Sequence, residues 1–456
     1  MNRIKQGFKS FPRKYPELLV FVLYLAFIFT LEASWSKSAI EHVYFQKWTS
    51  EDMMQTLPII DLRDHPVESL VNLHIQPPTL DLIRALLAQR WRDVADHSML
   101  LSVDQDLYRL WAVLFALMGV LIFRWLSQVT SFSWAAVAAF IFMLHPAAIM
   151  YATFLENTFL FSIGILWSYY ELWKLYNRPK ERPILPLAAS FSLIFFTRSI
   201  IQWPALLFFA ISLVLIRIPW RKILLFAVLC GAVVGFYTLR QQALFDIPYT
   251  SSLAGGNCFH GLGDFSTYAG YGVDQIPIQP PHSSASVLIR ENKLTGAINF
   301  NHNKYLQYHR AMLGKCYQRL LTQPINETLL AFFGNFLIYL QPSSQFTTPH
   351  IIADSLPWRG AYNAIFSRLV LLVLLVGSML IWIKTNPREN YLRGIGMLLP
   401  AVYIFLMTVL FERGENMRYK FFLEPVFFVF FVAQIHSLFE LFLLKSRSPS
   451  RLKTVS

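Results

Sequence analysis

Long apolar blocks recur along this chain, and basic residues lie in the short stretches between them. Many blocks approach the roughly 20 residues that a helix needs to cross a bilayer. The basic runs are MNRIKQGFKSFPRK, WKLYNRPKERP, RIPWRK, KTNPRENYLR and KSRSPSRLK. Only 15% of the residues are charged, against about 25% in soluble domains. This pattern predicts an all-α polytopic membrane protein.

The order of apolar and basic stretches predicts about ten transmembrane helices. We place them at 17–33, 107–127, 133–151, 154–172, 184–199, 201–217, 223–240, 365–383, 394–412 and 419–443. With both termini in the cytoplasm, every basic run lies inside, as the positive-inside rule requires. The net charge of +13 is then explained by these anchors, and we expect no nucleic-acid partner. The first apolar run lacks a following cleavage site and predicts a span, not a signal peptide.

This topology divides the chain into three parts and predicts two large outward loops. Residues 1–240 form an N-terminal membrane module with the first loop at 34–106, and residues 365–456 carry the last spans. Residues 241–364 form the second loop region. Its apolar segment 328–340 is too short to span, so we expect a re-entrant or interfacial segment.

The three cysteines carry little functional signal. Cys258 and Cys316 share the second loop region, where they could form a disulfide, but one pair does not decide this. Cys230 lies in an apolar block and is expected to be buried. The cysteines and histidines show no metal-ligand spacing, so we assign no metal site, and a divalent cation is left open as a cofactor.

Polar residues of the predicted spans gather at their outward ends. They occur in the turns MLHPAAIMYATFLENTF, FFTRSIIQWP and LFERGENMRYKFFLEP. A charged group at membrane depth costs at least about 2.5–3.5 kcal/mol on insertion scales, so such groups usually face a wet cavity or one another. Three helix pairs carry these turns on the side of the acidic first loop. We therefore expect one polar cavity at the outer leaflet.

Several stretches resemble a known family. PIIDLRDHPVESLVNLHIQPPTLDLI resembles the first extracytoplasmic loop of GT-C superfamily glycosyltransferases. The likeness is to the bacterial relatives of the protein O-mannosyltransferase and lipid A aminoarabinose transferase group. Their proline elbow is matched here by Leu73 to Leu80, with Thr79 where an apolar residue is usual. YATFLENTFLF, TRS and GENMRYKFFLEP resemble later turns of that family, whereas 241–325 resembles none.

The resemblance implies a GT-C-like fold and an activity. A sugar would move, with inversion, from a polyprenyl-phosphate donor to a glycan, lipid or protein acceptor on the extracytoplasmic face. The protein would contact membrane lipids and lie in a bacterial inner (plasma) membrane. The reaction needs one base to take the proton of the attacking hydroxyl and cations to stabilise the phosphate leaving group.

The resemblance places the base in the first loop, before the elbow. The candidates are Asp61, then Asp64 and Asp52, although each could instead be a solvated carboxylate or a helix N-cap. His74 and Gln76 would line the elbow, whose prolines hold the base in position. His74 could also be a loop histidine satisfied by its neighbours.

The outward turns supply the remaining candidates for substrate binding. Arg198 and Arg418 are the candidates for a phosphate clamp, because each lies at an outward helix end. Either could instead snorkel to lipid phosphate, and Arg418 could pair with a carboxylate three residues earlier. The other candidates are Glu156, Asn157, Glu415 and Asn416. The first two would bind sugar or pair with Arg198.

A polytopic transporter or flippase of lipid-linked saccharides is the main alternative. That class often shows inverted repeats and charges near mid-bilayer, and the sequence shows neither. A ligase or polymerase of lipid-linked glycans and a scaffold without a base are further alternatives. Replacing the three aspartates one at a time separates these possibilities, because only a transferase should lose turnover while it still binds lipid-linked sugar.

Overall fold

The computed structural model describes residues 15–37, 50–51, 55–262, 283–292, 294, 296, 299–345, 356–365 and 388–447. These residues are helices and connecting segments, without a strand among them. The helices of the first half are α2 (Pro16–Lys37), α3 (Ile59–Asp64), α4 (Pro66–Val71), α5 (Thr79–Arg90), α6 (Asp96–Val129), α7 (Phe132–Met143), α8 (Pro146–Thr153), α9 (Asn157–Asn177), α10 (Leu185–Thr197), α11 (Trp203–Leu215) and α12 (Trp220–Phe245). Those of the second half are α13 (Ala254–Gly261), α14 (Ser286–Ile289), α15 (Asn303–Thr322), α16 (Ile325–Tyr339), the 3₁₀ turn η2 (Ser343–Gln345), α18 (Arg359–Ile365), α20 (Arg388–Phe411), α21 (Asn416–Lys420) and α22 (Glu424–Arg447).

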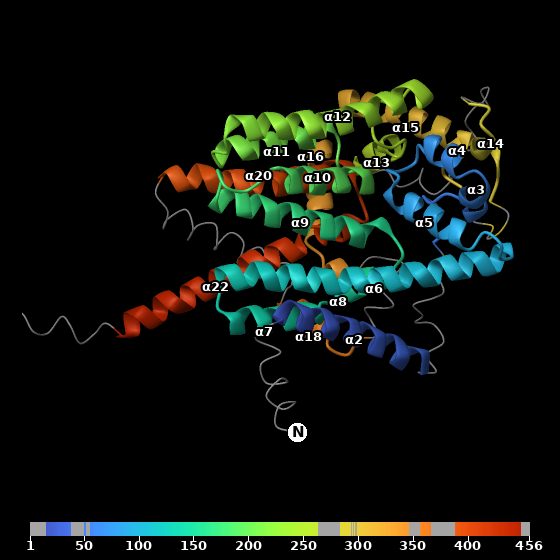
Figure 1. The fold of residues 1–456 in the computed structure, drawn as a ribbon. Coiled ribbons are helices and arrows are strands. Elements are labelled where there is room, and N and C mark those ends of the chain that lie inside the picture. The colour runs from blue at the N-terminus through green and yellow to red at the C-terminus, as the bar shows by residue number, and fades with distance from the viewer. Residues whose placement is uncertain are drawn as a thin grey trace, which may run out of the picture.

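Long apolar helices form the body of the molecule (Figure 1). Among the described residues, α2, α6, α12 and α20 are long and apolar enough to cross a membrane. Helices α7 and α8 add a fifth candidate if this pair, bent by 57°, is one broken span. Helices α10 and α11 are apolar but have only 13 residues each. The expected count of ten transmembrane helices is therefore not confirmed. Of the span expected at 365–383, residues 366–383 lie outside the described residues.

The helix ends follow from local sequence. Proline occupies the first or second position of α4, α8, α10 and α11, where its missing N–H breaks no helical hydrogen bond. Helix α12 ends where Asp246 turns into the left-handed region at φ 51°. The prolines at the helix starts are readable from the sequence alone.

Close packing joins α2 to α6 and α11 to α20. A Cβ atom at Gly119 of α6 would overlap the ring of Tyr24 from α2, so glycine is required for this approach. The hydroxyl of Tyr24 donates to the carbonyl of Ala139 in α7 at 2.5 Å. One buried ring thus holds three helices together.

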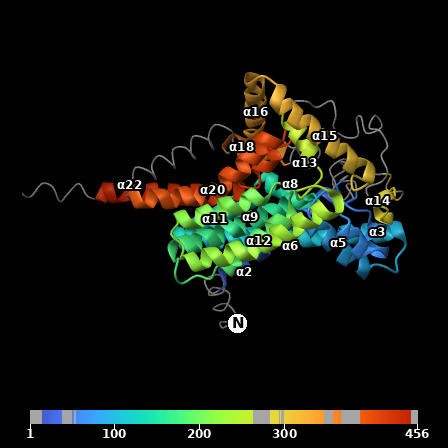
Figure 2. The ribbon, with the colours of Figure 1, turned by 90° about the horizontal axis from the view of Figure 1, so that it is seen from above.

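Helices α3, α4, α5 and α14 gather at one end of the long-helix bundle, beside the start of α6 (Figure 1). Figure 2 shows α13, α15 and α16 along one side of the molecule. Residues 328–340 lie mostly in α16, which is one unbroken helix, so the chain does not reverse within that segment. A disulfide joins Cys258 of α13 to Cys316 of α15, and Cys230 is buried and free as expected.

Candidate functional site

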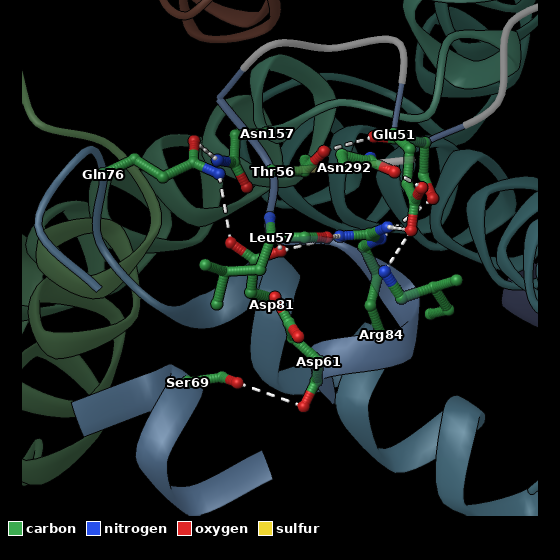
Figure 3. Close-up of polar contacts among 12 residues, drawn as sticks. Glu51, Thr56, Leu57, Asp61, Ser69, Gln76, Asp81, Arg84, Asn157 and Asn292 are labelled. Carbon is green, nitrogen blue, oxygen red and sulfur yellow. Dashed lines mark hydrogen bonds and ion pairs between the residues drawn. The ribbon is translucent and has the colours of Figure 1, made fainter. Parts of the chain in front are cut away.

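A buried charged network organises the loop between α2 and α6 (Figure 3). Its centre is Arg84 of α5, whose side chain is fully buried and pairs with Asp81 at 2.9 Å. Arg84 also donates to the carbonyl of Leu57 at 2.6 Å and to the hydroxyl of Ser50 at 2.8 Å. The carboxylate of Glu51 lies 3.5 Å from the same guanidinium. These contacts fasten the chain before α3 to α5.

The proline elbow leads directly into α5, and His74 anchors it. The Nδ1 atom of His74 lies 2.8 Å from the hydroxyl of Ser252, and Nε2 lies 2.9 Å from the carbonyl of Asn301. His74 is completely buried, and both of its ring nitrogens contact other residues of the protein. The unusual Thr79 donates its hydroxyl to the carbonyl of Phe196 at 2.6 Å, which explains a polar residue there.

Gln76 connects the elbow to the start of α9. Its Nε2 donates to Asp81 at 3.4 Å, and its Oε1 accepts from the side chain of Asn157 at 2.8 Å (Figure 3). Gln76 and Asn157 are 4% and 1% exposed. The two predicted substrate-binding residues therefore bind each other, and Asn157 directly follows Glu156, a member of a second polar cluster.

The second cluster joins the turns before α9, after α10 and at α21. Glu156 pairs with Arg198 at 3.0 Å and also with Arg418. Thr158 donates to Glu156 at 2.8 Å and accepts from Nε of Arg418 at 2.9 Å. Arg418 further pairs with Glu415 at 2.8 Å. Both ion pairs that the sequence offered as alternatives, Glu156–Arg198 and Glu415–Arg418, are thus present.

Asn416 closes the turn that carries this cluster. Its Nδ2 donates to the carbonyls of Thr408 and Glu412 at 3.0 and 2.8 Å. The preceding Gly414 has φ 92°, which a side chain would disfavour. Asn416 therefore caps the end of α20 and positions Arg418 from there.

The three candidate bases have different surroundings. Asp61 of α3 is buried, and its Oδ1 pairs with Arg290. Burial raises the pKa of Asp61, and Arg290 opposes that rise. Its Oδ2 is buried without a hydrogen-bond partner in the described part of the chain. Asp64 is exposed, and its hydrogen bond to Arg63 lowers its pKa. Asp52 lies outside the described residues.

The structure does not join all predicted residues in one hollow. Gln76 binds Asn157, and the preceding residue, Glu156, pairs with Arg198 and Arg418. No contact described here links Asp61 or Asp64 to either arginine. No group of three or more His, Cys, Asp or Glu side chains in the described ranges is arranged to hold a metal ion.

A cavity of about 390 Å³ adjoins the arginine cluster. Helices α11, α13, α15 and α20 supply most of its walls, and Glu412 and Tyr419 also line it. The hydroxyl of Tyr419 donates to Glu412 at 2.9 Å. The guanidinium groups of Arg198 and Arg418 lie 5.5 and 6.0 Å from the centre of the Tyr419 ring.

Sequence reasoning did not select Glu412 or Tyr419 as site residues. Both belong to the polar turn LFERGENMRYKFFLEP, so a signal was present. That signal could not rank the acidic residues of the turn, because helix ends and cavity walls are decided by packing. The structure shows that Glu412, and not Glu415, lines the cavity.

No family model matches the sequence, and no curated protein matches it. Among solved structures, the chain is similar to the archaeal oligosaccharyltransferase AglB from Archaeoglobus fulgidus, in complex with an inhibitory peptide and a dolichol-phosphate. The identity is 15% and the TM-score 0.50, over 98% of this chain and 53% of that chain. This chain therefore spans about half the length of that structure. The likeness concerns the fold alone.

Proposed function

We propose that this integral membrane protein is a glycosyltransferase that moves a sugar from a polyprenyl-phosphate donor to an acceptor on the extracytoplasmic face. The observation that carries the proposal is the cavity, whose mostly apolar walls end beside two buried arginines. A ligand that joins a lipid tail to a phosphate fits this combination. The dolichol-phosphate in the complex of the oligosaccharyltransferase supports such a donor.

Arg198 and Arg418 would stabilise the negative charge that develops on the departing phosphate. Glu156 contacts both guanidinium groups and so fixes their positions. Glu415 is the most exposed member of the cluster, with 34% of its side chain accessible. The donor phosphate would therefore replace Glu415 as the partner of Arg418, because displacing the most exposed carboxylate of the cluster breaks the least buried contact.

Asp61 is the proposed base, with Asp64 and Asp52 as the alternatives. The acceptor oxygen attacks the anomeric carbon, the bond from that carbon to the phosphate oxygen breaks, and the carboxylate takes the acceptor proton. The configuration inverts, and polyprenyl phosphate leaves. The proposal requires the acceptor to bind between α3 and the Glu412 end of the cavity.

The finer topology belongs to the same proposal. The protein would lie in a bacterial inner (plasma) membrane with ten spans and both termini in the cytoplasm. The loops 34–106 and 241–364 would then face the side where the acceptor, a glycan, lipid or protein, is found. Division of the chain at residues 240 and 364 follows from this topology.

Mass spectrometry of outer-surface glycans tests the activity. Cells without the gene should lack one sugar on one acceptor, and the wild-type gene should restore it. Asp61→Asn should fail to restore the sugar, whereas Asp93→Asn should restore it, because Asp93 is a solvated aspartate of the same loop with a side chain 92% exposed. Unchanged glycans in the deletion strain would contradict the proposal. Full restoration by Asp61→Asn would remove Asp61 as the base, and full restoration by Asp64→Asn and Asp52→Asn as well would favour the transporter alternative.

A further inference from the structure

We infer that Glu412 and Tyr419 form a sugar-recognition site, in which the Glu412 carboxylate binds neighbouring hydroxyl groups of the transferred sugar. The inference rests on the proposed function and adds the part of the donor that this end of the cavity selects. It assigns Glu412 to specificity, and it leaves the proton transfer to the loop carboxylate.

Glu412 is the single ionisable carboxylate or cation among the described residues that line the cavity. It is 7% exposed, and a buried carboxylate is costly unless it is hydrogen-bonded. The hydroxyl of Tyr419 donates a hydrogen bond to it. A carboxylate has about four acceptor positions, so this donor leaves room for two more. Two adjacent sugar hydroxyls provide such a pair.

Two neighbouring polar side chains, those of Gln202 and Thr408, are already hydrogen-bonded within the protein. Gln202 donates to the hydroxyl of Thr250 at 2.7 Å and accepts from its backbone N–H at 3.2 Å. Thr408 donates its hydroxyl to the carbonyl of Ile404 at 2.7 Å. Among the lining groups, the carboxylate of Glu412 is the strongest hydrogen-bond acceptor, because it is charged.

The cavity walls suit a ligand with both a sugar and a lipid part. Aromatic side chains of Trp203, Tyr249, Tyr317 and Phe411 line it, and such rings pack against the apolar faces of ligands. Trp203 is 54% exposed and Leu320 is 42% exposed. A lipid tail can thus leave the cavity past these two residues while the polar head stays at Glu412.

The charge arrangement orients the donor. Tyr419 contacts both charged groups: its hydroxyl binds the carboxylate of Glu412, and its ring centre lies 5.5 Å from the guanidinium of Arg198. A phosphate is attracted to Arg198 and repelled by Glu412. The ligand that satisfies both groups carries its phosphate toward the arginine and its hydroxyl groups toward the acid.

Lipid binding to the full-length protein in nanodiscs tests the inference. The probes are polyprenyl phosphate and the same lipid carrying glucose, mannose or arabinose, measured by native mass spectrometry. Wild type should bind at least one glycosylated lipid tenfold or more tightly than bare polyprenyl phosphate. Glu412→Gln should remove that preference by weakening the glycosylated lipid about tenfold, with bare-lipid affinity unchanged or raised. Glu327→Gln changes an exposed glutamate of α16 and should behave as wild type.

The outcomes separate the inference from the proposed function. If wild type binds none of the four lipids, the proposed function fails and the inference fails with it. If wild type binds them but Glu412→Gln changes nothing, or weakens bare and glycosylated lipid equally, the inference alone is wrong. Should Glu412→Gln fail to fold, Tyr419→Phe gives the same test, because it removes one donor to Glu412 and should reduce the preference for the glycosylated lipid.

Discussion

Replacement of Arg84 by alanine should loosen the segment before α3 without unfolding the helix bundle. The change removes a fully buried cation and with it the ion pairs that Arg84 makes with Asp81 and Glu51. Breaking a buried ion pair from one side costs about 3–5 kcal/mol. Because the pair fastens a loop, we expect this loss to appear as local opening. This free-energy loss corresponds to an increase of about two to nearly four powers of ten in the equilibrium constant for local opening.

Hydrogen exchange of peptides that contain Leu57 measures this opening directly, since its N–H is bonded to Asp81 at 3.1 Å. Arg90→Ala is the matched control, because Arg90 pairs with Asp106 at 3.1 Å but has a side chain 64% exposed. An exposed pair contributes about 0–1 kcal/mol, so exchange should rise less than about tenfold. The double variant Asp81→Asn, Arg84→Met removes both charges of the main pair and should recover part of the protection.

The defect should also depend on pH. Burial raises the pKa of Asp81, and Arg84 opposes the rise, so in Arg84→Ala the pKa of Asp81 rises further. A carboxyl whose folded pKa exceeds its unfolded value contributes stability at low pH that is lost as pH rises through the folded pKa. The variant should therefore lose less protection in acid than in base, after correction for intrinsic exchange. Equal exchange in Arg84→Ala and Arg90→Ala would refute the role of the network.

Three further predictions concern the surroundings of the site. Gly255→Ala would place its Cβ against the carbonyl oxygen of His309 and should hinder formation of the Cys258–Cys316 disulfide, which mass spectrometry would detect as free thiol. As the control, Gly314→Ala adds a Cβ in open space and should be neutral or stabilise the protein by about 0.5–1 kcal/mol. Gln76→Leu leaves buried polar groups of Asp81 and Asn157 unpaired and should destabilise the protein by about 1–3 kcal/mol; an unchanged unfolding midpoint would contradict the link between the clusters. Arg290→Gln removes the charge that opposes burial at Asp61, so the acid limb of the pH–rate profile should move to higher pH, and an unmoved limb would argue against Asp61 as the base.

Local patterns in the sequence were sufficient for the membrane class, for helix starts at proline and for the gathering of polar residues in a few turns. The pair Glu415–Arg418 was also within reach, because three residues along a helix bring side chains together. The sequence predicted the lengths of some helices less well, since α10 and α11 are shorter than the spans expected at 184–199 and 201–217.

Only the tertiary structure decided which polar residues meet. Gln76 and Asn157 are 81 residues apart, and Asp61 and Arg290 are 229 apart. Hydropathy indicates how deep a residue lies but carries no information on which helix faces which. Packing of α11, α13, α15 and α20 around a hollow made Glu412 a cavity residue, and no periodicity within one helix could specify that arrangement, because it depends on side chains from all four.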